Sequence, residues 1–555
     1  MLWWSVALGF VGLLFAPPAL GEHKPKTCLD VKNLYSNKGF SVTGVPATEI
    51  SGEHLRICPQ GYTCCTSDME VNLAMKSKNE FESLVKDSSR SVQNMLMDQH
   101  STFDSYFHEL LDQSEKNLHK KIQQMHRQLY TDNVKTFKDL FNDLRRYYKG
   151  ANINLEEALN EFWTRLMERL FRQHRQLKSQ HQITDDYLEC MVKQAEQMKP
   201  FGDVPRYFKI KLTRVLIAAR SFVQGLSIGS DVVKKVSQVS ASPECMRAMM
   251  RLMYCPHCRS MASIKPCNNY CLNIMKGCLA NQADLDSEWR NLIDSMIHVA
   301  DRFDGPSNME SFVDDIDQKI SEAIVNMENR FEHILSKVQQ GCGHLKSTAD
   351  RSPGDNSKRR SKRHYAEDKM GSSIAPQMDR LVTEVKMKLR DVKEFWINLP
   401  GEMCRERVTA GSANEDECWN GQNRGRYLPE VMSDGLANQI NNPEVEVDIT
   451  KPDMTIRQQI MQLRIMTNRL RNAYHGNDID FQDTSDDSSG SGSGDGCSEN
   501  ACSRKRSFNA ATSEPLLYPK PKPIGKNSSN SISLSLYSTF FHLLSVALAV
   551  QYFWR

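Results

Sequence analysis

The stretch Cys255-Pro-His-Cys258-Arg-Ser-Met-Ala-Ser-Ile-Lys-Pro-Cys267-Asn-Asn-Tyr-Cys271-Leu-Asn-Ile-Met-Lys-Gly-Cys278 holds the densest group of cysteines in the chain. Four more cysteines, Cys28, Cys58, Cys64 and Cys65, crowd into the N-terminal part of the sequence. Whether these residues form disulfides, bind metal or remain thiols depends first on the compartment in which the chain folds.

The first 21 residues have the features of a secretory signal peptide. An apolar run from Leu2 to Phe15 precedes the small residues Ala19-Leu20-Gly21, which suit cleavage before Glu22. Secretion would place the 16 cysteines, an even number, in an oxidising compartment where disulfides form. Cys255-x2-Cys258 beside His257 is also compatible with half of a zinc site, but the secreted context favours disulfides.

The charge composition argues against a nucleic-acid-binding protein. The chain has 71 basic and 68 acidic residues, a net charge of +3, whereas nucleic-acid binders are usually strongly basic. The sequence contains no Gly-x-Ser-x-Gly, no His-Glu-x-x-His and no phosphate-binding glycine loop. We therefore expect no enzyme, no catalytic residue, no metal and no cofactor.

Most of the sequence between residues 70 and 475 has the pattern of amphipathic helices. Leu155, Leu159, Phe162 and Leu166, for example, recur at the spacing of one helical face. We expect helices over Glu70–Tyr148, from Asn154 through Leu170, and over Tyr207–Gln238, Ala283–Phe303, Met309–Gln340, Met378–Phe395 and Ile456–Tyr474. Strand signals are few and short, such as Val445–Ile449. The predicted fold class is all-α, an elongated body of many helices.

Residues 347–374 interrupt this pattern and predict a disordered loop inside the body. A Ser-Pro-Gly-Asp-Asn-Ser segment is followed by the basic run Lys358–Arg363, with almost no apolar residue. Arg360, Lys362 and Arg363 match the R-x-K/R-R site of furin-like convertases, whose acidic pockets accept basic side chains of an extended segment. We predict cleavage after Arg363; the alternative is an uncut, solvated basic loop.

The polar stretch Asp483–Gly496 lies beyond the last predicted helix and contains three successive Ser-Gly dipeptides, at Ser489, Ser491 and Ser493. Its glycines keep the backbone flexible, and aspartates flank the dipeptides on both sides. A serine followed by glycine near carboxylates is typical of the acceptor for xylose, the first sugar of a glycosaminoglycan. We predict attachment at these three serines; the alternative is an unmodified Gly/Ser linker.

The apolar segment Leu534–Trp554 predicts a membrane attachment signal. The small residues Asn527-Ser528-Ser529-Asn530 and a short polar spacer precede it, and only Arg555 follows it. This order predicts a glycosylphosphatidylinositol (GPI) anchor on Ser528 or Asn527, with residues 529–555 removed from the mature protein. A single membrane-spanning helix is the alternative.

The cysteine stretch resembles the signature of the glypican family, C-x2-C-x-G, an aliphatic residue or Met, then P-C-x2-Y-C and G-C. Ser260 stands where the family usually has glycine. The resemblance covers nearly the whole chain, through segments at Gly52–Cys65, Leu279–Asp286, Tyr427–Met432 and Gly435–Val445. The segment Gly476–Ser485, the Ser-Gly run and the pair Cys497 and Cys502 most resemble glypican-4 and glypican-6, with glypican-1 a near neighbour.

The resemblance implies one α-helical core at residues 22–475 with a cysteine-rich N-terminal lobe, followed by a disordered stalk at residues 476–528 that bears glycosaminoglycan. It also implies seven disulfides, a connectivity that the sequence alone could not choose. These are Cys28–Cys64, Cys58–Cys255, Cys65–Cys258, Cys190–Cys342, Cys245–Cys278, Cys267–Cys418 and Cys271–Cys404. Cys497 and Cys502 lie outside this set, and we expect a local pair or no structural role.

The function that the resemblance implies is that of a heparan sulfate proteoglycan on the extracellular side of the plasma membrane, or shed from it. Its polymer would bind heparin-binding growth factors and morphogens of the fibroblast growth factor, Wnt and Hedgehog types, and extracellular matrix proteins, by charge. The membrane would be a partner through the GPI lipid, and nucleic acid would not be one. The rival interpretation is a GPI-anchored binding module or co-receptor that acts through its disulfide-rich protein core.

Overall fold

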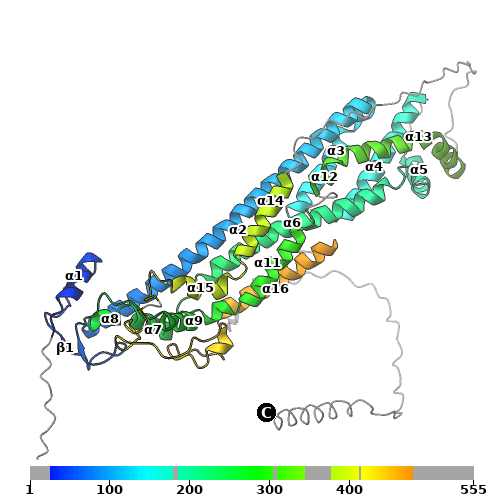
Figure 1. Cartoon of the computed structure of the whole chain (residues 1–555). Helices are drawn as coiled ribbons and strands as arrows, with labels where there is room; N and C mark the ends of the chain where they lie inside the picture. Colours follow the sequence, from blue (N-terminus) through cyan, green and yellow to red (C-terminus); the bar gives the residue numbers. More distant parts are fainter. Residues whose placement is uncertain (1–25, 179–184, 304–308, 344–376, 412–413, 479–555) are drawn as a thin grey trace, which may run out of the picture. The chain divides into compact units, whose positions relative to one another are not determined.

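The computed structural model of this chain describes residues 26–178, 185–303, 309–343, 377–411 and 414–478 (Figure 1). The chain divides into two units, Met1–Asp487 and Ser488–Arg555, and every described residue belongs to the first. That unit is built from helices, with one two-stranded sheet among its described residues. The predicted all-α class is confirmed.

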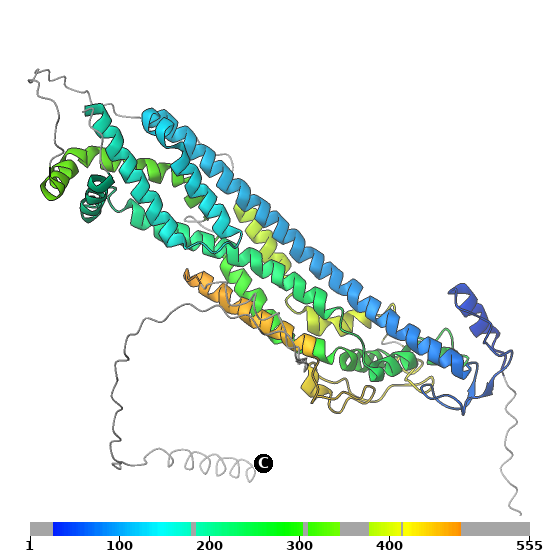
Figure 2. The same cartoon turned by 180° about the vertical axis from the view of Figure 1, so that it is seen from behind.

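Helix α2 (Ser67–Met125) is the longest element of the unit. It has 59 residues, which at 1.5 Å per residue gives a length of about 88 Å. Its first turn is capped by Thr66, whose hydroxyl accepts a hydrogen bond from the backbone N–H of Met69. Helix α6 (Val204–Val236) packs along α2, and both helices contribute buried side chains to the same core (Figures 1 and 2).

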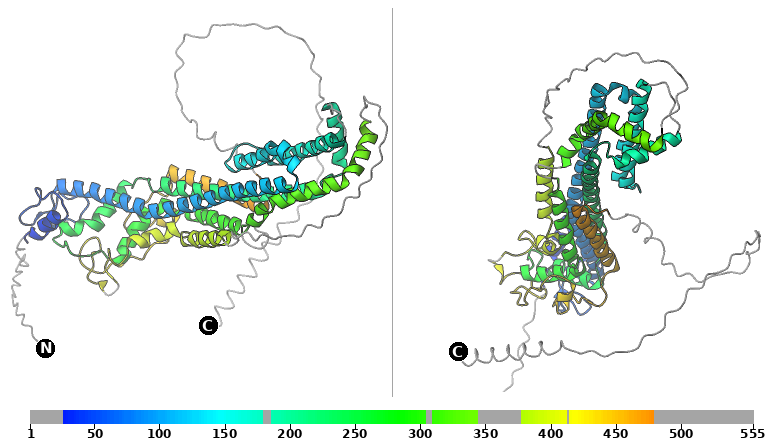
Figure 3. Two further views of the ribbon diagram at one scale, coloured as in Figure 1. Left: turned by 90° about the horizontal axis from the view of Figure 1, so that it is seen from above. Right: turned by 90° about the vertical axis from the view of Figure 1, so that its right-hand side faces the viewer.

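The expected helix over Glu70–Tyr148 is in fact two helices, because the backbone leaves the helical region at His126 (φ −133°, ψ 54°). Helix α3 (Arg127–Tyr148) folds back along α2, so that Arg145 near its end forms ion pairs with Asp112 and Glu115. Figure 3 shows the two helices side by side. No proline or glycine marks the turn, and the apolar stripe continues through it, so the sequence pattern does not reveal the break.

Seven further helices of the described residues complete a single large core around α2 and α6. They are α4 (Leu155–Lys178), α5 (Asp185–Gln197), α11 (Asp286–Ala300), α12 (Met309–Asp314), α13 (Ile316–Cys342), α14 (Gln377–Asp391) and α16 (Met454–His475). The prediction over Met309–Gln340 is divided at Asp315, between α12 and α13. Helix α16 packs against α6 and α11 and ends at Gly476, whose φ of +82° suits glycine.

Short elements form an N-terminal lobe with a second core. They are α1 (Leu29–Asn37), β1 (Ile50–Ser51), β2 (Tyr62–Thr63), α7 (Pro243–Met253), α8 (Cys255–Cys258), α9 (Asn268–Cys278), α10 (Ala280–Ala283), α15 (Phe395–Met403) and the 3-10 helix η2 (Leu436–Gln439). The two strands pair antiparallel, with Ile50 opposite Thr63. The buried residues of this lobe are cysteines, aromatic residues and aliphatic residues that lie far apart in the sequence.

The expected strand over Val445–Ile449 is wrong. Val445 is buried, but its backbone N–H donates to the side-chain oxygen of Asn442 rather than to a neighbouring strand. The side chain of Asn442 also donates to the carbonyl of Asn273 on α9. A side chain therefore satisfies the backbone here, and an alternating apolar pattern cannot distinguish that from a sheet.

Glu70, in the first turn of α2, connects the long helix to the lobe. Its side chain is 3% exposed, and its two carboxylate oxygens accept hydrogen bonds from the backbone N–H groups of Arg56, Ile57 and Cys58, each at 2.8 Å. One helix residue thus accepts from three backbone donors of the loop that carries Cys58, of which the Cys58 N–H is buried and the other two are partly buried. Unpaired backbone donors away from water are costly, so this carboxylate helps to fix the loop of the lobe against α2.

We predict that Glu70→Ala lowers the unfolding free energy by about 3 kcal/mol, because three backbone N–H groups, one buried and two partly buried, lose their acceptor. The matched control is Asp68→Ala in the same helical turn, where the exposed carboxylate interacts only with the helix dipole and the cost is below about 1 kcal/mol. Guanidinium unfolding of the secreted protein with its disulfides intact measures both. Equal losses in the two variants would show that Glu70 acts only as a helix-terminus charge.

Candidate functional site

The modification sites predicted from the sequence lie outside the described residues. These are the glycosaminoglycan serines Ser489, Ser491 and Ser493, the anchor position at Ser528 or Asn527, and the convertase residues Arg360, Lys362 and Arg363. The cysteines of the core are described, and the geometry available for a site is that of the disulfide-linked lobe and the cleft beside it.

The described residues contain seven disulfides, and they are the same seven pairs that the family resemblance implies. They are Cys28–Cys64, Cys58–Cys255, Cys65–Cys258, Cys190–Cys342, Cys245–Cys278, Cys267–Cys418 and Cys271–Cys404. Six of them hold the N-terminal lobe together, and the pair Cys190–Cys342 joins α5 to α13 at a distance from it in the fold.

The zinc alternative for Cys255-x2-Cys258 is wrong, because both cysteines are oxidised. Cys255 is bonded to Cys58 and Cys258 to Cys65, so neither offers a thiolate to a metal. Within the described part of the chain, no group of three or more His, Cys, Asp or Glu side chains is arranged to hold a metal ion.

His257, between these two cysteines, is a neutral core residue. It is 6% exposed and packs between the rings of Tyr35 and Tyr254, with ring centroids 5.9 and 5.5 Å away. Burial, assisted by the positive charge of Lys38, lowers the pKa of His257 to about 4. At neutral pH the imidazole is therefore uncharged, and packing accounts for its position.

The structure explains why the family pattern prefers glycine at position 260. Ser260 has φ of +57°, in the left-handed region that costs a residue with a Cβ about 1 kcal/mol or more. In this chain its hydroxyl donates a 2.7 Å hydrogen bond to the carboxylate of Glu49, which is buried and also accepts from the backbone N–H of Lys26. The serine thus gains a hydrogen bond that offsets the strained backbone.

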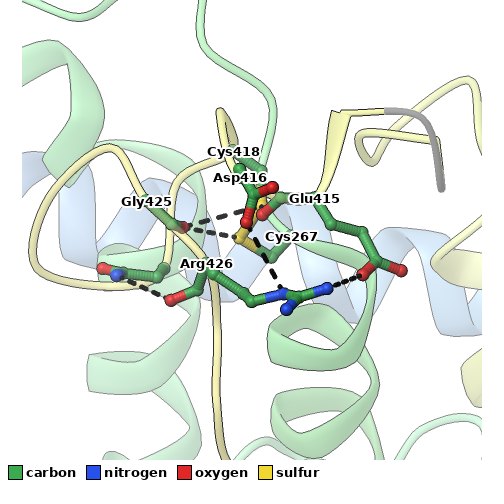
Figure 4. A network of polar contacts seen from close by, with 7 residues as sticks. Cys267, Glu415, Asp416, Cys418, Gly425 and Arg426 are labelled. Atoms are coloured by element: carbon green, nitrogen blue, oxygen red, sulfur yellow. Dashed lines mark hydrogen bonds and ion pairs between the residues drawn. A yellow bond between two sulfur atoms is a disulfide. The ribbon is translucent and has the colours of Figure 1, made fainter.

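A polar cleft of about 570 Å³ opens beside the disulfide Cys267–Cys418. Figure 4 shows the polar contacts around this disulfide. Its walls are the start of α9, the segment from Cys404 to Gly411 and the segment from Glu415 to Tyr427. Arg426 belongs to the wall formed by the segment from Glu415 to Tyr427. Its guanidinium forms ion pairs with Glu415 at 3.3 Å and Asp416 at 3.6 Å.

Asn273 was not identified from the sequence, and it forms a hydrogen bond with Tyr427 at the end of the wall from Glu415 to Tyr427. It is fully buried on α9, and its amide donates to the hydroxyl of Tyr427 and the carbonyl of Glu430, while its oxygen accepts from the backbone N–H of Met432. The one available signal is an asparagine amid the apolar residues Leu272, Ile274 and Met275 of the cysteine stretch. Such a residue needs buried polar partners.

The chemistry of the cleft is that of an exposed polar surface with charges of both signs. Arg405, Arg407 and Arg426 contribute positive charge, and Glu406 and Glu415 oppose it. Cys267, Cys404 and Cys418 are all in disulfides, so the cleft offers no thiolate nucleophile.

None of the described helices is long and apolar enough to cross a bilayer.

A helical core, stabilised by a disulfide-linked N-terminal lobe, is the class of protein that this fold defines. The family model for Glypican matches residues 14–553, and the chain belongs to the glypican family. Among curated relatives, glypican-1 of Gallus gallus is 56% identical over 541 residues, 97% of each chain. Glypican-1 of Homo sapiens is 53% identical over 522 residues, which are 94% of this chain and 92% of the relative.

Solved structures agree with this family. The crystal structure of C-terminally truncated glypican-1 matches with a TM-score of 0.74 at 53% identity, covering 82% of this chain and all of that one. The structure of Dally-like protein in complex with O-palmitoleoyl serine matches with a TM-score of 0.63 at 30% identity, covering 82% and 99%. The expected likeness to glypican-4 and glypican-6 is not confirmed, because the two curated relatives named above are both glypican-1.

We predict that His257 makes the lobe less stable in acid. Its folded pKa of about 4 lies below the ordinary value near 6.5, so between these pH values the unfolded chain binds the proton more readily. Stability from this group is complete above pH 6.5 and falls by about 3 kcal/mol as pH drops to 4. Denaturant unfolding of wild type and His257→Gln across this range measures the difference.

The pH dependence of wild-type stability alone would not isolate His257. The titration of Asp314 changes the unfolding free energy in the opposite direction, so a comparison with a variant is needed. Burial and the neighbouring carboxylates Glu310, Asp315 and Asp317 raise the pKa of Asp314 to about 6, so the folded state gains its proton first. This group therefore favours the folded state as pH falls through 6. Parallel stability curves for wild type and the His257 variant would contradict the prediction.

Proposed function

We propose that the chain is the core protein of a heparan sulfate proteoglycan that is attached to the outer face of the plasma membrane by a GPI lipid. The observation that carries the proposal is the run of three Ser-Gly dipeptides at Ser489, Ser491 and Ser493 among aspartates, in a chain of the glypican family. Serine hydroxyls in such a run suit the transfer of xylose, on which heparan sulfate is built. The apolar segment Leu534–Trp554 behind small residues supports the lipid anchor.

The proposed mechanism separates the protein body from the binding polymer. Sulfate and carboxylate groups along heparan sulfate attract Lys and Arg patches on growth factors and morphogens, as phosphates attract nucleic-acid-binding proteins. The attraction is sensitive to salt, because exposed charges are screened beyond about 10 Å at 0.1 M ionic strength. Polymer held near the membrane raises the local ligand concentration around receptors for fibroblast growth factor, Wnt and Hedgehog ligands.

We predict that Ser489→Ala, Ser491→Ala and Ser493→Ala together abolish the polymer while folding and anchoring remain, because alanine has no hydroxyl for xylose. The heparinase-sensitive smear on a gel should vanish, and salt-sensitive capture of a basic growth factor should vanish with it. The matched control changes Ser485, Ser488 and Ser498, which no glycine follows, and should keep the smear.

Release from cells by phosphatidylinositol-specific phospholipase C should be equal for all three proteins, which checks the anchor separately. If the triple variant at the Ser-Gly serines still carries heparan sulfate, the acceptor lies elsewhere and the assignment of these serines is wrong.

The family also suggests cleavage after Arg363 by a furin-like convertase. The disulfides Cys267–Cys418 and Cys271–Cys404 each join a cysteine before this position to one after it. The two products would therefore stay covalently linked until reduced. Helix α16, which follows the cut, also packs against α6 and α11, which precede it.

We predict that Arg363→Ala leaves one core chain on a reducing gel after heparinase treatment, whereas the parent gives two. The arginine supplies the basic side chain next to the cleaved bond, and alanine cannot replace it. Lys358→Ala lies in the same basic run but outside the four-residue site, so this control should still be cut. Two bands from Arg363→Ala would place the cleavage at another bond.

A second candidate function is ligand capture by the protein core itself. The specific observation in its favour is that a solved relative of the same fold, Dally-like protein, was crystallised in complex with O-palmitoleoyl serine, a fatty-acylated amino acid. We infer that the helical core of this chain also accepts an acylated ligand. The triple serine variant separates the two functions, since capture of an acylated ligand by the core would survive loss of the polymer.

A further inference from the structure

Helix α16 has an unusual charge composition for a chain that is nearly neutral. Its 22 residues include Arg457, Arg464, Arg469 and Arg471 but no aspartate or glutamate. Over the whole chain, basic and acidic residues are almost equal in number, 71 against 68. The positive charge of α16 is therefore not balanced within the helix, as it is on helices that carry internal ion pairs.

Three of these arginines lie in one row on the solvent side. Arg457, Arg464 and Arg471 are seven residues apart, and seven steps of 100° return to within 20° of the start, so the three lie within about 40°. Met461 and Asn468 lie between them, and Met461 is 53% exposed. We call the row Arg457, Met461, Arg464, Asn468 and Arg471 the arginine ridge.

The opposite side of α16 is buried and fixes the ridge toward solvent. Ile456, Leu463, Met466, Leu470 and Ala473 have little or no exposed surface and belong to the large core. This side packs on α6 and α11, and α16 lies at the margin of the helical body in two opposite views (Figures 1 and 2). The ridge is thus held in a straight line by packed neighbours.

Only one arginine of the ridge forms an ion pair with a described side chain. Arg464 donates to the carboxylate of Glu288 on α11 at 2.9 Å, although its side chain remains 58% exposed. Arg457 and Arg471 form no ion pair with any side chain that the structure describes. An arginine guanidinium presents several donors in a planar fork, a geometry suited to oxyanions such as sulfate and carboxylate.

The spacing of the ridge matches a linear, repeating polyanion. Arg457 and Arg471 are 14 residues apart, so the charged row extends about 21 Å along the helix. A polymer with regularly spaced sulfates can contact all three arginines at once, whereas a single small anion contacts one. Binding of this kind is the sum of several weak, salt-sensitive contacts.

The covalent chain brings one such polymer within reach. Helix α16 ends at His475, and Asp478 is tied to the body, because its carboxylate accepts a 2.7 Å hydrogen bond from the hydroxyl of Tyr147. Ser489 follows only 11 residues later, a span of about 40 Å at most. A polymer begun there is covalently restricted to the neighbourhood of α16, which raises its effective concentration at the ridge.

We propose that the arginine ridge of α16 binds heparan sulfate non-covalently, and that its occupant is the polymer that the proposed function attaches at Ser489, Ser491 and Ser493. This inference rests on that proposed function. The segment of polymer near its attachment point would lie along α16, and the segments further out would remain available to ligands. The site is the ridge alone, and the ligand class is a linear sulfated sugar polymer.

The first arm of the test uses the full chain with Ser489, Ser491 and Ser493 changed to alanine, so that no attached polymer competes. The probe is a heparin-derived dodecasaccharide, titrated at low and at physiological salt. We expect R457Q/R471Q to weaken binding about fivefold, because each exposed charge contributes a modest screened attraction. Amide hydrogen exchange should slow over Met454–His475 when the probe binds.

The control R206Q/R380Q removes two exposed arginines that also form no ion pair with a described side chain, but that lie on α6 and α14. It should weaken binding less than about twofold. Equal losses in the two double variants would show that only net charge matters and would overturn the ridge. Unchanged binding in R457Q/R471Q would assign the ridge to another partner, such as a protein, and also overturn the proposal.

The second arm tests the occupant in the protein that carries its own polymer. Phenylglyoxal modification of arginine, followed by mass spectrometry, should be slower at Arg457 and Arg471 before heparinase digestion than after it, and unchanged at Arg206. Equal rates before and after digestion would overturn binding of the attached polymer. If wild type carries no heparinase-sensitive polymer, the proposed function itself fails, a result that is independent of the dodecasaccharide titration.

Discussion

Two disulfides between the N-terminal segment and the middle of the chain are the constraint on which the rest of the structure depends. Cys58–Cys255 and Cys65–Cys258 close loops of 197 and 193 residues. In the chain-entropy model, the first closure of so long a loop stabilises the fold by about 5 kcal/mol. The second adds far less entropy, since the ends are already joined, but it removes rotation about a single link and so fixes orientation.

These two disulfides help to set the direction of the long helix α2. Thr66 caps α2 immediately after Cys65, and Glu70 in its first turn accepts the backbone donors of the loop around Cys58. The start of α2 is thus fixed against α7 and α8 by covalent bonds and buried hydrogen bonds together. Every helix that packs along α2 is placed with respect to a rigid base, and α6 and α16 are placed through that packing.

The sequence predicts the parts of this fold that depend on local periodicity. Helices α6, α11, α14 and α16 are recovered nearly in full, and α4 is recovered as far as Leu170, because one apolar stripe on each faces a core. The break at His126 is missed, since the stripe continues across a hairpin in which both helices face the same core. The strand at 445–449 is wrong, because the side chain of Asn442, and not a neighbouring strand, satisfies the backbone there.

The geometry of the candidate site is less predictable from the sequence than the helices are. Pairs separated by more than 100 residues, such as Cys271–Cys404, cannot be derived from spacing, and only the family resemblance supplied them. Ser260 was seen as a departure from the family pattern, but its left-handed backbone and its hydrogen bond to Glu49 needed the fold. The buried role of Asn273 could not be read from the sequence, because its partners lie over 150 residues away.

The position of the last described disulfide would have a mechanical consequence if the proposed lipid anchor holds the chain at its C-terminus. Beyond Cys418, no described residue is cross-linked, so α16 is retained by packing of Leu463, Met466 and Leu470 and by its cap at Asp453. Tension from such an anchor would therefore act first on α16, next on the lobe segment that packs through Trp419 and Val445, and would stop at Cys267–Cys418. The disulfides that orient the lobe on α2 would stay intact even if α16 detached, because all of them join residues at or before Cys418.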